Sequence, residues 1–328
     1  MQKTVCIFGG SGFIGKYVTQ DLVRAGYRIK IVTRIPESAY ALKTYGNVGQ
    51  VVAVNCNYGD QESLEAAMNG CEVVINLAGI LFEKRKSKFK YVHCDLPKNI
   101  AEICTKKKIQ KFIHVSACGV DKAGSKYATS KCDGEKQILE SYPKAILLRP
   151  SVVFGPGDSF FNMFAKLASF LPCLPLIGGG KTKFQPVYVG DISEAIKNIV
   201  TSQSDEFNGK TYELCGPDTV TFKEIYELLL AEINRKRRLV SVPWGIAKIQ
   251  GFFFGLLPKP LLTVDQVRSL KTDNIMSANA LGLKELGVES TAMRTILPRY
   301  LSNFKKGGRF AEKLQSVPST PEINKKTA

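Results

Sequence analysis

A glycine-rich segment near the start of the chain has the spacing of a phosphate-binding loop. Gly9, Gly12 and Gly15 follow the apolar run VCIF and precede a helical pattern. In this context the first glycine permits a tight turn, the second lets a pyrophosphate approach the backbone, and the third lets the helix pack on the strand. The helix N-terminus then offers free N–H groups to phosphate. The residues predicted to contact a dinucleotide here are Gly9, Ser11, Gly12, Phe13, Ile14 and Gly15.

The end of the second expected strand bears on which dinucleotide would bind. Sites for NAD(H) usually carry an acid there for the ribose 2′-hydroxyl, whereas this strand ends in Arg34. A guanidinium suits a 2′-phosphate, so NADP(H) is favoured. NAD(H) is the alternative if Arg34 is only an exposed loop residue. Asn57 or Tyr58 is expected to line the adenine pocket. Leu77, Ala78 and Gly79 are expected to pass beneath the dinucleotide.

Three residues in the middle of the chain have the types and spacing of a carbonyl–alcohol catalyst. Tyr127 and Lys131 stand four residues apart in KYATSK, which places them on one face of a helix. The lysine is expected to lower the phenol pKa and to reach the ribose hydroxyls. The tyrosine would then act as general acid or base, while Ser116 holds the substrate oxygen. Ser116, Tyr127 and Lys131 are therefore the predicted catalytic residues.

The first half of the chain predicts a scaffold for these residues, because short apolar strands alternate with helices. Such alternation indicates a parallel sheet covered on both faces. The predicted fold class is α/β: a doubly wound parallel Rossmann sheet with a smaller, mostly helical C-terminal subdomain. The expected strands are 4–8, 28–33, 49–54, 72–77, 111–116 and 145–149, and the expected helices are 13–25, 61–68, 89–107 and 126–141.

After residue 150 helices dominate the pattern. We expect a loop over 171–180, a short strand over 185–189, a helix over 191–200, a further strand over 210–214 and a helix over 221–233. Thr221 and Glu224 form a capping-box pattern, and Asp60 is expected to cap the helix over 61–68. The predicted organisation is a Rossmann domain over 1–150, a substrate or interaction subdomain over 151–304 interleaved with it, and a disordered tail over 305–328.

Composition narrows the classes of partner. The net charge of +17 and a pI near 9.4 favour a nucleotide, an anionic membrane surface or nucleic acid as partner. The sequence carries no nucleic-acid-binding signature, so no nucleic acid is expected. Nine cysteines without C-x-x-C spacing indicate free thiols in a reducing compartment, and no metal is predicted.

The sequence also bears on location. Only Met1 and Gln2 precede the first strand, and no apolar run approaches about 20 residues, so we expect no signal peptide, transit peptide or transmembrane helix and a cytoplasmic protein. Residues 243–257 (PWGIAKIQGFFFGLL) form either a core helix or one that lies on a membrane. Trp244 and Phe252–Phe254 are expected to be core residues, with an anionic membrane as the alternative contact.

Several polar residues have a structural interpretation. His114 lies inside a strand and is expected to be a satisfied core histidine, whereas His93 has no evident partner. Glu135 stands four residues after Lys131, which predicts a helical salt bridge. Asp158 and Asp191 are expected to be loop and helix-cap residues.

The motifs together resemble the extended and atypical short-chain dehydrogenase/reductase superfamily, whose members include NAD-dependent epimerases and dehydratases. The resemblance rests on the glycine loop, Asn76–Gly79, Ser116, Tyr127-x-x-x-Lys131, the run 149–158 (RPSVVFGPGD) and the run 185–191 (QPVYVGD). Within it, Pro258-x-Pro260-x-x-Thr263-x-Asp265-Gln266-Val267 and Leu270-Lys271-x-Asp273-Asn274 are similar to the nucleotide-binding accessory subunit of respiratory complex I and its bacterial relatives.

This resemblance implies a tightly held NADP(H) and an accessory or assembly role in complex I or quinone metabolism. It implies respiratory-chain subunits as partners and a peripheral position on the inner face of a bacterial membrane. Pro150 and Val153 are expected to contact the nicotinamide through backbone atoms, with a role in shaping the turn as the alternative. The alternative is an active NADP-dependent oxidoreductase or epimerase-like enzyme that uses the Ser116, Tyr127 and Lys131 trio. Only ten residues separate Ser116 from Tyr127, fewer than in active extended enzymes. A purely cofactor-holding role for the tyrosine and lysine therefore stays open beside catalysis.

Overall fold

The computed structural model of the protein describes residues 3–84, 87–258, 260–306 and 308. The disordered tail predicted over 305–328 lies outside the described residues, apart from its first few positions.

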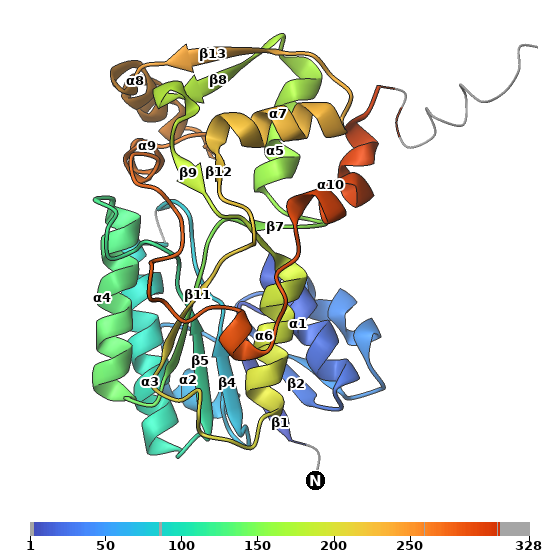
Figure 1. The fold of residues 1–328 in the computed structure, drawn as a ribbon. Helices are drawn as coiled ribbons and strands as arrows, with labels where there is room; N and C mark the ends of the chain where they lie inside the picture. The colour runs from blue at the N-terminus through green and yellow to red at the C-terminus, as the bar shows by residue number, and fades with distance from the viewer. Residues whose placement is uncertain (1–2, 85–86, 259, 307, 309–328) are drawn as a thin grey trace, which may run out of the picture.

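Seven parallel strands form the central sheet, in the order β11-β6-β5-β4-β1-β2-β3 (Figure 1). The strands are β1 (Thr4–Phe8), β2 (Arg28–Thr33), β3 (Val51–Asn55), β4 (Val73–Asn76), β5 (Lys111–Val115), β6 (Ile146–Pro150) and β11 (Thr211–Leu214). Every residue of the interior strand β1 is buried, as expected for a parallel strand covered on both faces. The doubly wound Rossmann prediction is confirmed, and the strand expected over 210–214 adds to the sheet beside β6.

Helices cover the two faces of this sheet (Figure 1). On one face lie α1 (Phe13–Arg24), α6 (Val189–Thr201) and the 3-10 segment η1 (Pro36–Tyr45). The other face is covered by α2 (Gln61–Ala67), α3 (Leu96–Lys106) and α4 (Lys126–Ser141). The helix predicted over 89–107 begins with a π-helical turn, η2 (Lys90–Asp95), before α3. Apolar side chains from each helix meet the sheet, so two hydrophobic layers hold the strands in place.

Two predicted helix caps are present. The Asp60 carboxylate accepts the Ser63 backbone N–H at 2.9 Å, at the start of α2. The Thr221 hydroxyl accepts the Glu224 N–H, and the Glu224 carboxylate accepts the Thr221 N–H, at the start of α7 (Phe222–Glu232). Both caps satisfy backbone donors that the first helical turn leaves free.

The C-terminal part packs around an aromatic-rich core of its own, formed mainly by α5 (Phe160–Phe170), α7 and α10 (Met293–Leu301). Its strands form three pairs: β7 (Val153–Phe154) with β10 (Val187–Tyr188), β9 (Lys183–Phe184) with β12 (Val220–Thr221), and β8 (Cys173–Ile177) with β13 (Arg238–Val242). Its remaining elements are η3 (Gly178–Gly180), α8 (Trp244–Gly255), α9 (Val264–Ser269), η4 (Lys284–Leu286) and η5 (Ser302–Phe304).

The prediction of a loop over 171–180 is wrong, because five of these residues form β8. Two prolines and three glycines there suggested irregular backbone. The partner strand β13 begins more than sixty residues later and supplies the backbone hydrogen bonds, in parallel register from Cys173–Arg238 to Ile177–Val242. A pairing this distant leaves no signal in the local sequence.

The core position predicted for the α8 phenylalanines is also wrong. Phe252, Phe253 and Phe254 are 60%, 61% and 40% exposed. The helix buries instead its small residues Ala247 and Gly251. Trp244, at the start of α8, is half-buried. Among the described residues, no helix is long and apolar enough to cross a membrane.

Candidate dinucleotide-binding site

The glycine loop between β1 and α1 takes a shape that only glycine accommodates. Gly9 has φ +75°, and a Cβ there would lie 2.9 Å from the Ala78 backbone N, so this position permits the tight turn. Gly12 is exposed, and a Cβ there would meet only the Gly9 carbonyl, so its outer side is open. At Gly15 a Cβ would lie 2.5 Å from the Gly10 carbonyl oxygen. The third glycine therefore permits close packing on the loop itself rather than on the strand as expected.

The N-terminus of α1 is free to receive an anion. Gly12 is the N-cap and makes no side-chain cap, and the first turn contains no acidic residue. Its N–H groups and the positive end of the helix dipole thus face the open side of the loop. Ser11, Phe13 and Ile14 are half-buried around this point. The backbone here fits the pyrophosphate of a dinucleotide.

The end of β2 carries a cation, Arg34, that forms no ion pair within the described residues. Arg34 is exposed, and its guanidinium carbon lies 5.6 Å from the centroid of the Tyr58 ring, which is fixed by a hydrogen bond from its hydroxyl to the Val32 carbonyl. Within the described part of the chain Arg34 forms no salt bridge. Asn57 is exposed nearby, and its side-chain oxygen accepts the Gly59 N–H at 3.1 Å. The stacked, unpaired guanidinium is suited to a phosphate at this corner.

Lys131 brings α4 to the carboxyl ends of β4 and β5. Its side chain is only 4% exposed, and Nζ donates to the Val115 carbonyl at 3.1 Å. A Cβ built on Gly79, just beyond β4, would lie 3.5 Å from the same Nζ. Burial lowers the pKa of Lys131 from its ordinary 10.5 to about 8, although the Glu135 carboxylate acts in the opposite direction. The ammonium group therefore lies where the nicotinamide half of a dinucleotide would cross the sheet.

The predicted salt bridge between Lys131 and Glu135 is wrong. Glu135 instead accepts two hydrogen bonds from Arg149 on β6, at 3.0 Å to Nε and 2.6 Å to Nη2. Arg149 also lies 3.9 Å from Glu213 and 3.4 Å from Asp121. A guanidinium fits a carboxylate in this two-bond geometry, which an ammonium cannot match. Lys131 thus stays without a direct carboxylate partner.

Tyr127 lies one turn before Lys131 on the same face of α4. Its half-buried ring packs edge-on against His93 at 5.3 Å and Phe89 at 5.9 Å between ring centroids. Burial raises the pKa of Tyr127 to about 12. The expected lowering of this pKa by Lys131 is therefore wrong, because burial of the phenol is the effect that shifts it. The Lys131 ammonium group donates to the Val115 carbonyl.

Ser116 follows β5 and contributes an unpaired hydroxyl. The residue is 4% exposed, and its Oγ has no hydrogen-bond partner among the described residues. Its backbone N–H donates to the Leu148 carbonyl, which fixes its position at the end of the sheet. A buried hydroxyl without a partner is unfavourable unless a ligand or water oxygen pairs with it. The contacts of Pro150, which ends β6, and Val153, which begins β7, with a nicotinamide stay a prediction.

His93 is a site residue that the sequence analysis missed. It is fully buried, and Nε2 accepts the Ile80 N–H at 3.1 Å while Nδ1 lies 2.9 Å from Ser130 Oγ. Ser130 Oγ donates onward to the Tyr127 carbonyl, so we assign the proton of the neutral ring to Nδ1. Burial lowers the pKa of His93 to about 3. This neutral histidine links the segment after β4 to the helix that carries Tyr127.

The other polar residues have structural roles. His114 is fully buried, and burial holds its pKa well below the usual range. Its Nδ1 contacts an asparagine of β4, whereas its Nε2 has no hydrogen-bond partner in the described region. The prediction that both ring nitrogens of this core histidine are hydrogen-bonded is therefore only half met. Asp158 lies in a loop, as predicted, and accepts the Gly155 N–H of that loop and the Asn162 N–H in the first turn of α5. Asp191 does not cap its helix, since its carboxylate accepts from the Thr291 N–H and hydroxyl instead.

The C-terminal segment is tied to the start of α4. The two carboxylate oxygens of Asp265, on α9, accept the backbone N–H groups of Lys126 and Tyr127 at 2.8 and 2.9 Å. Asn274 accepts from the Ser151 hydroxyl at 2.6 Å and donates to the loop after β5. Asp265 and Asn274 both belong to the 258–274 motif that resembles the complex I accessory subunit. That motif was the sequence signal that could have pointed to these contacts. Their contacts fix the Tyr127 helix against the C-terminal part.

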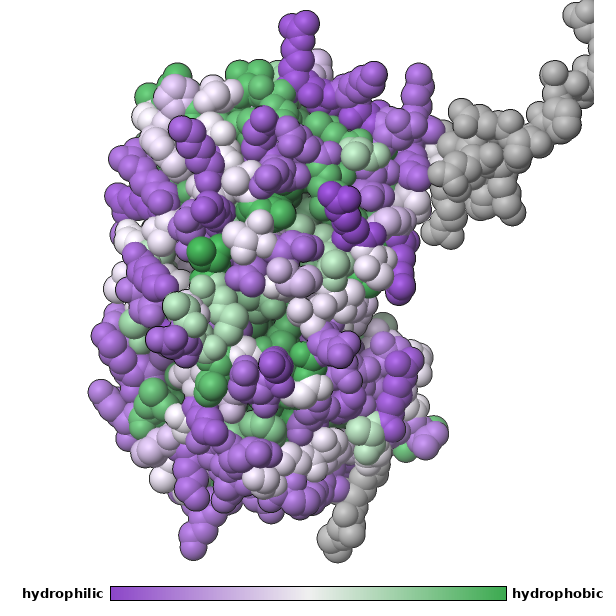
Figure 2. Space-filling model, in the orientation of Figure 1, coloured by the Kyte–Doolittle hydropathy of each residue, from purple (hydrophilic) through white to green (hydrophobic). Residues whose placement is uncertain are grey.

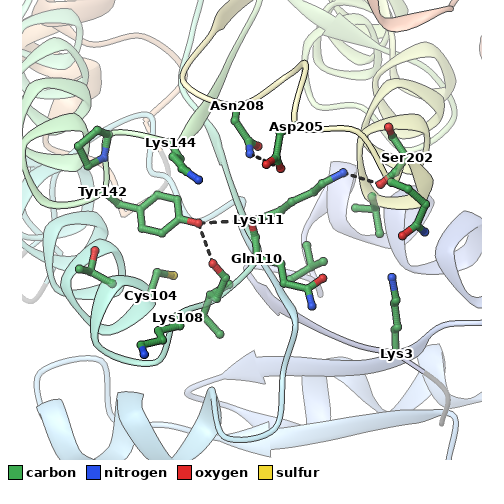
Figure 3. A pocket seen from close by; sticks show the side chains of 16 residues that line it. Lys3, Cys104, Lys108, Gln110, Lys111, Tyr142, Lys144, Ser202, Asp205 and Asn208 are labelled. Carbon is green, nitrogen blue, oxygen red and sulfur yellow. Dashed lines mark hydrogen bonds between the residues drawn. The ribbon is translucent and has the colours of Figure 1, made fainter.

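A separate hollow of about 630 Å³ lies at the opposite, amino-terminal edge of the sheet (Figure 3). Two of its polar side chains are engaged: Lys111 donates to the Ile199 and Ser202 carbonyls, and Tyr142 donates to the Ile109 carbonyl. Nothing there presents a cradle for phosphate comparable with the glycine loop. Within the described ranges, no group of three or more metal-ligating side chains is close enough to hold a metal ion. All nine cysteines are free thiols.

The parallel seven-stranded sheet, the glycine loop after β1 and the tyrosine–lysine pair beside β5 define a Rossmann protein of the short-chain dehydrogenase/reductase type. The model of the NAD dependent epimerase/dehydratase family matches residues 5–215, more than half of the chain. The chain belongs to this family, and the findings support a nicotinamide dinucleotide as its cofactor.

Individual relatives are of two kinds. The chain is 33% identical to subunit 9 of the NADH dehydrogenase [ubiquinone] 1 alpha subcomplex from Arabidopsis thaliana, a mitochondrial protein, over 92% of this chain and 78% of that one. It is 28% identical to a ceramide reductase of Caulobacter vibrioides, over 73% of each chain. An NADPH-dependent quinone oxidoreductase from Escherichia coli, solved with NADPH, has the same fold, with a TM-score of 0.70 and 20% identity over 91% of this chain and 99% of that one.

Proposed function

We propose that this protein holds NADP(H) as a resident cofactor and serves as an accessory or assembly subunit of respiratory complex I or of quinone metabolism. Its partners would be respiratory-chain subunits, and its position peripheral on the inner face of a bacterial membrane. The observation that carries this proposal is the 33% identity to the plant complex I subunit. That similarity covers 92% of the chain, so it extends past the matched family residues 5–215 into the C-terminal part.

The polar groups of the site support a holding role for the tyrosine and lysine. The Lys131 ammonium is buried and already donates to a backbone carbonyl, and the pKa of Tyr127 is about 12. A general acid or base works best with a pKa near the working pH, and the raised pKa of Tyr127 lies far above neutral pH. When bound, the dinucleotide would supply hydride-transfer chemistry. The chain would supply the α1 N-terminus, Arg34, Tyr127 and Lys131 as its contacts.

The second candidate function is an active NADP-dependent oxidoreductase that acts on a carbonyl or alcohol through Ser116, Tyr127 and Lys131. The Ser116 hydroxyl supports it, because it is buried without a hydrogen-bond partner among the described residues and would gain from pairing with a ligand oxygen. The bacterial relative is named a ceramide reductase, which supports reductive chemistry on this scaffold. An epimerase-like reaction would use the same three residues.

The two functions differ in nucleotide turnover, which a comparison of wild type with Tyr127→Phe measures. Both proteins are purified, and the oxidation of their bound nucleotide by quinones and carbonyl compounds is followed. The proteins are then denatured, and the released nucleotide is identified. We expect NADP(H) from both proteins and no oxidation in either. Turnover by wild type that Tyr127→Phe abolishes would establish the enzyme and remove the case for a purely accessory role.

The choice of NADP(H) over NAD(H) rests on Arg34. In Arg34→Ala we expect NADP(H) affinity to fall by about tenfold or more, because a charge-assisted contact to the 2′-phosphate is lost. The affinity for NAD(H), which has no 2′-phosphate, should stay within a factor of about two. Lys43→Ala, an exposed cation on η1, is the matched control. Equal losses for both nucleotides would contradict the NADP(H) assignment.

The partner proposal is tested in cells that carry the gene. Their membranes are isolated, and native complexes are separated with antibody detection of this protein. Co-migration with a respiratory complex, and loss of assembled complex in a deletion strain, are the expected results. A protein that never enters such a complex, and whose deletion leaves assembly intact, would refute the accessory role.

A further inference from the structure

The outer surface of α8 and the turn after it is apolar. We call this surface the α8 face and define it by its exposed large hydrophobic residues: Ile246, Ile249, Phe252, Phe253, Phe254, Leu256, Leu257 and Leu261. These eight lie within sixteen consecutive residues of the chain. Exposed apolar side chains gathered in this way mark an interaction surface rather than ordinary scatter.

The exposure does not arise from a loosely packed helix. The inner side of α8 is closely packed through Ala247, which is fully buried, and Gly251, where a Cβ would lie 2.9 Å from the Thr263 and Val264 backbone of the segment that begins α9. Trp244 packs on Gly178 so closely that a Cβ there would collide with the indole ring. The helix therefore already has its intramolecular contacts, and its large side chains remain for another partner.

The surroundings of the α8 face are strongly basic. Residues 236–271 contain seven lysines and arginines and a single acid, Asp265. That acid is engaged by the N–H groups at the start of α4. Lys248 is exposed on α8 itself, Arg268 is exposed on α9, and the exposed Lys271 lies with Nζ 5.6 Å from the Trp244 ring. Large apolar side chains flanked by cations match the interface of an anionic bilayer, where acyl chains and acidic headgroups meet.

The α8 face lies at the end of the C-terminal part that is remote from the central sheet (Figure 1). Figure 2 shows one side of the molecule, which is mostly hydrophilic, with apolar residues at the end where α8 and the β8–β13 pair lie and others across the middle of the face. An exposed end of the molecule can meet a flat surface without a steric conflict from the Rossmann layers. No described helix can span a bilayer, so the contact would be interfacial.

We propose that the α8 face inserts shallowly into an anionic lipid bilayer, with the neighbouring lysines and arginines on the lipid headgroups. α9 joins this face to the α4 N-terminus through Asp265, so the dinucleotide site would be held at a fixed orientation above the membrane. The inference gives a structural basis for the peripheral position in the proposed function. The test of membrane insertion needs neither the nucleotide nor a respiratory complex. The membrane proposal and the proposed function can therefore fail separately.

The experiment uses the full chain and its single tryptophan, Trp244, which begins α8. Vesicles of phosphatidylcholine alone, and of phosphatidylcholine with phosphatidylglycerol, are compared by flotation and by quenching of Trp244 with lipids brominated on the acyl chains. We expect flotation and quenching only with the anionic vesicles, weakened by salt. Phe253→Ser with Leu256→Ser should lower partitioning by about tenfold or more, because two exposed apolar side chains no longer leave water.

Two control variants distinguish binding through the α8 face from the effect of removing any exposed apolar or charged side chain. Ile35→Ser with Val48→Ser removes exposed apolar groups from the Rossmann part and should leave partitioning unchanged. Lys248→Glu with Lys271→Glu should weaken binding to anionic vesicles, whereas Lys136→Glu on α4 should do so much less. Absence of flotation with anionic vesicles overturns the proposal. So does flotation without Trp244 quenching, or a dimer in solution that Phe253→Ser with Leu256→Ser dissociates in place of lipid binding.

Discussion

Replacing Lys131 with methionine should remove a specific pH dependence of stability from the nucleotide-free protein. Burial lowers the folded-state pKa of Lys131 from 10.5 to about 8, so the unfolded chain binds more protons between these two values. The penalty for burying the charge is therefore fully present below pH 8 and is relieved as the pH rises toward 10.5. Proton linkage with these pKa values gives a gain in unfolding free energy of about 2 kcal/mol between about pH 7 and pH 9.5.

Urea denaturation of both proteins across this pH range, in the presence of a thiol reductant, is the assay. Other groups contribute to the absolute pH dependence, so the quantity of interest is the difference between wild type and Lys131→Met at each pH. That difference should change by about 2 kcal/mol in favour of wild type on going to high pH. Lys136→Met, on the exposed side of α4, is the matched control and should show no such change. A difference that is independent of pH would refute the buried, unpaired state of Lys131.

Three further predictions concern the loop, the buried ion pair and the C-terminal tie. Gly15→Ala should lower nucleotide affinity by about tenfold or more, measured by calorimetric titration, because its Cβ would displace the Gly10 carbonyl in the phosphate loop. Arg149→Met should lower the unfolding free energy in urea by about 3–5 kcal/mol, because Glu135 would be left buried and unpaired. Asp265→Asn should cost about 1–2 kcal/mol, since one of two charge-assisted bonds to the α4 N-terminus is lost.

A control variant accompanies each of these three predictions and tests whether the effect depends on the contact named. Gly124→Ala places a Cβ where no atom lies within 4 Å and should bind nucleotide normally. The double variant Arg149→Met with Glu135→Gln should recover part of the lost stability if the unpaired carboxylate is the cause. Asp133→Asn, an exposed acid on α4, should have little effect compared with Asp265→Asn. Normal affinity in Gly15→Ala, or equal effects in Asp133→Asn and Asp265→Asn, would contradict the corresponding argument.

Most of the sheet and the position of the glycine loop could be predicted from the sequence because both depend on local patterns. Short apolar runs such as VCIF specify buried parallel strands, and the helix predicted over 126–141 has the bounds that α4 shows. The glycine spacing requires only the turn between neighbouring elements. For the same reason the spacing of Tyr127 and Lys131 was sufficient to place them on one helix face.

Contacts between distant segments were decided by the tertiary structure alone. Glu135 has Lys131 one turn away in sequence, but β6 brings Arg149 to it with better two-bond geometry. Strand β8 exists because β13 lies beside it, and the α8 phenylalanines are exposed because α9 packs on the small residues of the helix. Apolar composition cannot distinguish a buried helix face from one left for another partner.

The sequence by itself thus determined the Rossmann sheet, the dinucleotide loop and the residue types at the site. The tertiary structure decided their electrostatic state: a lysine with its pKa lowered to about 8, a tyrosine with its pKa raised to about 12, and the neutral His93 between two elements. The physical reason is that a pKa depends on desolvation and on the groups within a few ångströms. Both are set by segments that meet only when the chain folds.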